Sequence, residues 1–115
     1  MTQAKDKLFC NPSEFELAKS TEENTPPPDF TIELTKYAEK LTAGEQVTVT
    51  FTKATGETNE NKVVASEGYA DLDRLVSCKL KISKKAEGWY NVKIKGNTST
   101  KENEQKKALL INRVA

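Results

Sequence analysis

The segment 79–96 carries basic and aromatic side chains at a spacing that could bind an anion. Lysines alternate with apolar residues on both sides of a short turn, and Gly88 suits the left-handed position of a three-residue hairpin loop. The predicted hairpin places Lys79 opposite Lys95, with a second pair of opposed lysines and Trp89 on the same face. Because like charges that lie opposite each other destabilise a sheet, folding alone does not account for this face.

Single-stranded nucleic acid would suit this face, because lysines contact phosphates and an exposed indole ring stacks on a base. We therefore expect a nucleic-acid-binding surface made of Lys79, Lys81, Lys84, Lys85, Trp89, Lys93 and Lys95. Two explanations without nucleic acid stay open. Lysines on an edge strand discourage pairing with the sheet of another molecule, and acidic residues elsewhere in the chain could neutralise the lysines.

Charge is divided unevenly along the chain. Residues 1–73 contain seven Lys or Arg against fourteen Asp or Glu, and residues 74–115 contain eleven against three. An acidic N-terminal segment could cover the basic face or bind a partner protein. The candidate protein-interaction residues are Glu14, Glu16, Glu22, Glu23 and Asp29. A solvated acidic tail is the simpler alternative.

The residue types exclude the common catalytic classes. The chain contains no histidine, which removes Ser-His-Asp and Cys-His catalysis and every histidine general base. Cys10 and Cys78 are its two cysteines, and they do not form a closely spaced pair of the kind that binds zinc. The five glycines are isolated, so no phosphate-binding loop is present. We therefore expect a non-enzymatic protein without a metal or a cofactor.

The sequence favours a cytoplasmic location. No run of eighteen apolar residues could form a membrane-spanning helix, and the first twenty residues lack the apolar stretch of a secretory signal. In that setting Cys10 and Cys78 are expected to be free thiols rather than a disulfide. We expect no membrane partner.

The chain divides into an N-terminal acidic arm with a proline-rich linker, residues 1–29, and a single β-rich domain, residues 30–115. A helix start and a short strand both fit the segment 11–17. The linker contains three successive prolines, which favour an extended conformation outside any sheet interior.

Alternation of apolar and polar residues predicts the strands of the domain. They are expected at 30–34, 45–54, 62–66, 76–82, 90–94 and 108–114. One or two helical turns are predicted at 35–45 and a short helix at 66–77, and the polar run 97–107 should be a mobile loop.

Five or six short strands with one or two helices indicate a small antiparallel barrel or a highly twisted sheet, OB-like or SH3-like, with an α+β sheet as the alternative. The leading functional hypothesis is a β-barrel that binds single-stranded DNA or RNA through the Lys/Trp hairpin. The alternative is a protein-interaction module, a small adaptor or inhibitor of phage or mobile-element origin. A structural subunit of a larger assembly is a further alternative.

Overall fold

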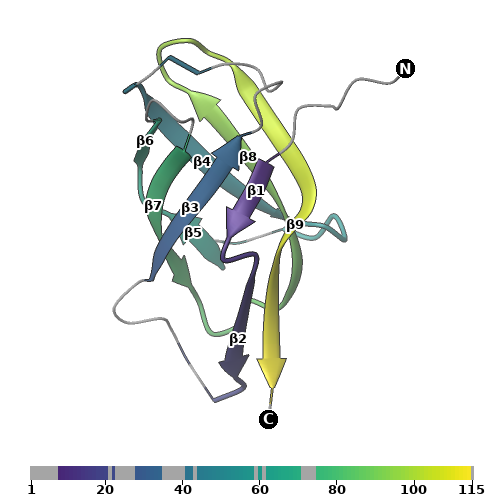
Figure 1. Cartoon of the computed structure of the whole chain (residues 1–115). Coiled ribbons are helices and arrows are strands. Elements are labelled where there is room, and N and C mark those ends of the chain that lie inside the picture. Colours follow the sequence, from purple (N-terminus) through teal and green to yellow (C-terminus); the bar gives the residue numbers. More distant parts are fainter. Residues whose placement is uncertain are drawn as a thin grey trace, which may run out of the picture.

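The computed structural model describes residues 8–20, 22, 28–34, 41–42, 44–58, 60, 62–70 and 75–114. All regular structure within these ranges is β-strand, and no helix occurs there (Figure 1). The strands are β1 (Leu8–Asn11), β2 (Glu14–Ala18), β3 (Asp29–Leu34), β4 (Gln46–Lys53), β5 (Val63–Ala65), β6 (Gly68–Ala70), β7 (Leu75–Ile82), β8 (Gly88–Gly96) and β9 (Glu102–Val114).

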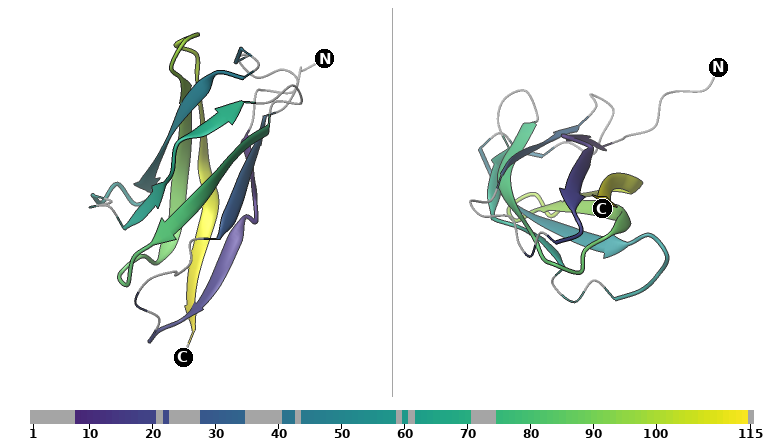
Figure 2. Two further views of the ribbon diagram at one scale, coloured as in Figure 1. Left: turned by 90° about the vertical axis from the view of Figure 1, so that its left-hand side faces the viewer. Right: turned by 90° about the horizontal axis from the view of Figure 1, so that it is seen from below.

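The strands form one continuous sheet in the order β1-β3-β7-β6-β4-β8-β9-β2, and β5 pairs with β7. Neighbouring strands are antiparallel, except that β2 runs parallel to β9. The sheet curls so far that it is nearly closed into a barrel, as the end-on view in Figure 2 shows. The predicted small, mainly β-barrel is therefore confirmed.

The strand order adds a detail that the sequence did not provide. One half of the sheet reads β1-β3-β7-β5 and the other reads β4-β8-β9. These orders are the same as those of the ABED and CFG sheets of an immunoglobulin-type sandwich. Here β6 joins the two halves, because it pairs with both β4 and β7. Connectivity of this kind occurs in proteins of many functions and carries no function by itself.

The expected N-terminal arm is wrong for residues 8–18, which belong to the barrel. β1 pairs with β3, and after a turn β2 pairs with β9 at the opposite end of the strand order. Leu8 and Cys10 are buried, while Phe15 and Leu17 pack against the core. The apolar side of each short strand covers the barrel interior. Of the two predictions for residues 11–17, the strand is therefore correct and the helix start is wrong. The triproline itself is described only at Pro28, and Glu23 lies outside the described residues.

The predicted helix at 66–77 is also wrong. Its described residues form β6 and the start of β7, which pair with each other. The two-residue period that begins at Val76 and Cys78 continues along β7 to Ile82, and these inward residues are buried. The helical turns predicted at 35–45 fall mainly outside the described residues; Glu45 precedes β4 without helical structure.

The predicted mobile loop at 97–107 is only partly a loop. β9 begins at Glu102 and pairs with β8 from there on. Opposite charges explain the pairing, since Glu102 lies opposite Lys95 and Glu104 lies opposite Lys93. A tight turn at 97–100 joins the two strands.

The barrel interior contains the apolar residues that the alternating pattern predicted. Phe30 and Ile32 of β3, Val47 and Phe51 of β4 and Ile94 of β8 are almost fully buried. The rings of Phe30 and Phe51 lie 6.1 Å apart between centroids, so the two halves of the sheet meet across the core.

Candidate interaction surface

The predicted hairpin of opposed lysines does not form. β7 pairs with β3, β5 and β6, whereas β8 pairs with β4 and β9. β6 and β4 stand between β7 and β8 in the sheet. The connection 83–87 therefore crosses from one half of the barrel to the other, and Lys79 is not opposite Lys95.

The seven candidate nucleic-acid-binding residues fall on three separate parts of the molecule. Lys79 and Lys81 are exposed on the outer side of β7. Trp89, Lys93 and Lys95 point outward from β8, on the other half of the sheet. The remaining two, Lys84 and Lys85, are exposed in the 83–87 connection. The structure does not bring them together as one basic surface.

Acidic residues accompany most of these lysines. The Nζ atom of Lys79 lies 3.2 Å from a carboxylate oxygen of Asp29, and that of Lys84 lies 3.4 Å from Glu22. Two of the predicted protein-interaction acids thus contact two of the predicted nucleic-acid-binding lysines. Both pairs are exposed, so each contributes little to stability, but each reduces the local positive potential.

A different set of predicted residues does come together, around Trp89. Trp89 lies opposite Leu110 of β9, and Leu110 lies opposite Glu14 of β2. The side chain of Trp89 is 45% exposed, and Val114 at the end of β9 is 37% exposed. Glu16 lies opposite Asn112 on the same side of β2. We call this surface, made of Trp89, Leu110, Val114, Glu14 and Glu16, the Trp89 face.

The Trp89 face therefore combines the tryptophan of one predicted site with two carboxylates of the other. Figure 1 shows the ends of β2 and β9 running side by side toward the C-terminus. A bulge in the β8–β9 pairing separates this end from the row of Lys93 and Glu104 farther along the strands. Beyond the bulge, Lys93 and Lys95 of β8 each lie opposite a glutamate of β9.

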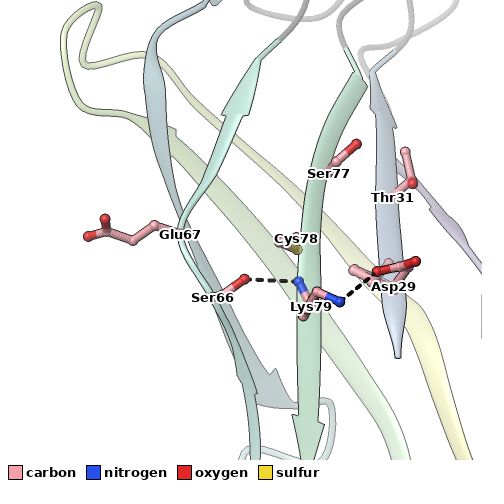
Figure 3. Close-up of a pocket in the computed structure, with 8 residues that line it drawn as sticks. Asp29, Thr31, Ser66, Glu67, Ser77, Cys78 and Lys79 are labelled. Atoms are coloured by element: carbon pink, nitrogen blue, oxygen red, sulfur yellow. Dashed lines mark hydrogen bonds and ion pairs between the residues drawn. The ribbon is translucent and has the colours of Figure 1, made fainter. Parts of the chain in front are cut away.

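The other half of the sheet carries an open cleft of about 510 Å³ (Figure 3). Its lining consists of Asp29, Phe30, Thr31, Ser66, Glu67, Ser77, Cys78 and Lys79. The backbone N–H of Lys79 donates a hydrogen bond of 2.9 Å to Oγ of Ser66. The cleft contains the hydroxyl groups of Thr31, Ser66 and Ser77. None of these hydroxyl groups is paired with a histidine base, because the chain contains no histidine.

Arg113 was not predicted as an important residue, although the sequence pattern indicates that its side chain points into the barrel. It follows Leu109 and Ile111 at a spacing of two, which places it on the buried side of β9. The guanidinium is 8% exposed and donates hydrogen bonds to the carbonyl oxygens of Ser83 (2.7 Å) and Ala86 (3.0 Å). A longer bond of 3.3 Å reaches Ala18 O at the end of β2. Arg113 thus holds the 83–87 connection and β2 against β9, below the Trp89 face.

Glu45 is a second buried charged residue that no sequence pattern indicated. It is 6% exposed, and its carboxylate accepts hydrogen bonds from the backbone N–H groups of Thr42, Thr98 (3.0 Å) and Ser99 (2.9 Å). Burial acts to raise the pKa of Glu45, but the hydrogen bonds from Ser99, Thr42 and Thr98 outweigh it and leave the pKa below its usual value. A side chain at Gly96 would collide with this carboxylate, because an added Cβ would lie 2.4 Å from Oε1.

Cys10 and Cys78 are free, as expected, and both are buried. They face Ile32 and Phe30 from opposite sides of β3, so two strand spacings, roughly 10 Å, separate their backbones. A disulfide needs Cα atoms closer than about 7 Å. Burial raises the pKa of Cys10 to about 12, with a smaller effect of the Cys78 charge, and burial raises the pKa of Cys78 to about 11.

Comparison with known proteins adds no functional assignment. No protein-family model matches the chain, and no curated protein matches its sequence. Among the described residues, no three His, Cys, Asp or Glu side chains form a group that could hold a metal ion. The same part of the chain contains no helix long and apolar enough to cross a membrane.

Proposed function

We propose that this protein is a non-enzymatic protein-interaction module of the cytoplasm that binds its partner through the Trp89 face. The observation that carries the proposal is the exposure of Trp89 beside Leu110 on the outside of the barrel, with the exposed Val114 farther along the same side of β9. Tryptophan is enriched among the residues that dominate the binding energy of protein interfaces. An apolar centre with a polar rim is also the usual anatomy of such an interface.

Nucleic-acid binding is the weaker hypothesis, for electrostatic reasons. A nucleic-acid strand whose base stacked on Trp89 would bring its phosphates close to the carboxylates of Glu14 and Glu16. The lysines of β8 lie opposite Glu104 and Glu102, and those of β7 are on the other half of the sheet. Phosphate contacts supply most of the affinity of non-specific nucleic-acid binding, and this arrangement offers few of them in one place.

The test uses two exposed aromatic residues that lie on different strands, Trp89 on β8 and Tyr69 on β6. Tagged full-length protein captures partners from the cells that produce it, and the purified candidate is then titrated with wild type, Trp89→Ala and Tyr69→Ala. Tyr69 is 60% exposed and lies opposite Ser77 of β7, so it is a matched control away from the Trp89 face. We expect Trp89→Ala to weaken binding by about 2 kcal/mol or more, roughly thirtyfold, and Tyr69→Ala to have little effect.

Two results would overturn the proposal. One is equal binding by wild type and Trp89→Ala. The other is a change of the tryptophan emission when oligonucleotides are added to the protein. In that case the affinity for the oligonucleotide would fall steeply between roughly 50 and 200 mM salt and would depend on Lys93 and Lys95. The second result would favour the nucleic-acid hypothesis.

A further inference from the structure

The charges around Trp89 indicate what kind of protein segment the Trp89 face would accept. Glu14 and Glu16 are both exposed, and in the described part of the chain neither carboxylate forms an ion pair. The acids farther along the same half of the sheet differ from them, because Glu102 and Glu104 each lie opposite a lysine. Two carboxylates without an ion pair in the described part of the chain therefore lie next to the exposed apolar residues.

We infer that the Trp89 face binds a basic segment of its partner, in which Lys or Arg side chains flank a large apolar residue. This inference rests on the proposed function and names the chemistry of its partner. A nucleic acid or an anionic lipid surface would bring more negative charge against Glu14 and Glu16. A basic peptide instead neutralises both carboxylates while its apolar side chain covers Trp89 and Leu110.

The strand geometry sets the spacing that such a segment needs. Glu14 and Glu16 are two residues apart on β2, so their Cα atoms lie roughly 7 Å apart along the strand. Two strand spacings, roughly 10 Å, separate Glu14 from Trp89 across the sheet. Lysines two residues apart in an extended segment, or four apart on a helix, match the first distance.

Two pairs of glutamates on this half of the sheet provide two double variants with the same change in net charge. Glu14→Gln/Glu16→Gln removes the two carboxylates beside Trp89. Glu102→Gln/Glu104→Gln removes two carboxylates from the same half of the sheet at the same change in net charge. A difference between the two double variants reports the position of the charge rather than the total charge of the protein.

The experiment uses the full-length protein labelled with ¹⁵N and two short synthetic peptides. The peptides share their leucine positions and differ only in having lysine or glutamate at all other positions. We expect the lysine peptide to shift the amide signals of β2, β9 and the start of β8. Its affinity should fall roughly tenfold in Glu14→Gln/Glu16→Gln and change less than twofold in Glu102→Gln/Glu104→Gln. Higher salt should weaken it, because exposed charges are screened.

Three outcomes would overturn the inference: equal binding of the glutamate peptide, signal shifts confined to β3 and β7, or equal weakening by the two double variants. These outcomes are separate from failure of the proposed function. If the purified partner depends on Trp89 but the lysine peptide does not bind the Trp89 face, the interaction module stands and the basic partner segment is wrong. If Trp89→Ala leaves partner binding unchanged, the proposed function itself fails.

Discussion

Replacing Glu45 tests how the end of the barrel that carries the β8–β9 turn is held in place. The carboxylate accepts three backbone N–H groups, two from the turn at Thr98 and Ser99 and one from Thr42 in the preceding loop. In Glu45→Gln the oxygen Oε1 can still accept the first two. The amide nitrogen, which replaces Oε2, would then face the N–H of Thr42, so two donors would meet.

The size of the effect follows from these contacts. Hydrogen bonds to a charged group contribute about 1.5–3 kcal/mol each, and an unsatisfied buried donor carries a similar cost. We expect Glu45→Gln to lower the free energy of unfolding at pH 7 by about 2–3 kcal/mol. Because the folded pKa of Glu45 is below its ordinary value of 4.5, its contribution is complete above that value. The contribution disappears as the pH falls through the lowered folded pKa.

Urea unfolding followed by tryptophan emission measures both effects, with Glu57→Gln as a control at an exposed glutamate. The gap in stability between wild type and Glu45→Gln should be largest near neutral pH and should narrow below pH 4.5. A loss below about 0.5 kcal/mol at pH 7, or a gap that widens as the pH falls, would refute the role assigned to the carboxylate.

Two further predictions concern buried groups. Arg113→Met keeps a long apolar stem but removes the guanidinium donors from the carbonyl oxygens of Ser83 and Ala86, of which, among the described residues, only that of Ser83 keeps another donor, the N–H of Ala86. The free energy of unfolding should therefore fall by about 3 kcal/mol. Urea denaturation checks this, and a loss under 1 kcal/mol would contradict it. Because burial keeps Cys10 and Cys78 protonated, both thiols should react with a thiol reagent at pH 8 only as fast as the protein unfolds. Rapid reaction of either native thiol, or a disulfide between them in the oxidised protein, would argue against the strand arrangement.

The strands and their buried faces could be predicted because the two-residue period is a local property. Val47 and Phe51 of β4, or Leu80 and Ile82 of β7, alternate with polar residues whatever strand lies beside them. The same period places Arg113 on the inner side of β9. The class of fold followed from the number and length of such segments.

Strand pairing could not be predicted in the same way, because neighbours in the sheet are far apart in the sequence. The short connection 83–87 suggested a hairpin, yet β7 and β8 pair with other strands. The predicted lysine face depended on that hairpin, so it was lost with it. The Trp89 face arises instead from the parallel pairing of β2 with β9, which brings Glu14 close to Trp89 from a distant part of the chain.

Polar composition was the second source of error. The run 97–107 lacks apolar residues, and even the inward positions at the start of β9 are polar, Asn103 and Gln105. The outward residues Glu102 and Glu104 lie opposite lysines of β8. Its strand character therefore depends on its partner. Likewise the acidic N-terminal segment was predicted to be an arm outside the β-rich domain. Four of its apolar residues, Leu8, Cys10, Phe15 and Leu17, instead cover the barrel at both ends of the strand order.

The most direct test of the Trp89 face is acrylamide quenching of the tryptophan emission, because Trp89 is the only tryptophan in the chain. In the free protein the half-exposed indole should be readily quenched. Saturation with the purified partner should reduce the quenching constant severalfold, because the indole would be buried in the interface. An unchanged quenching constant at saturation would show that the partner binds elsewhere and would contradict the account.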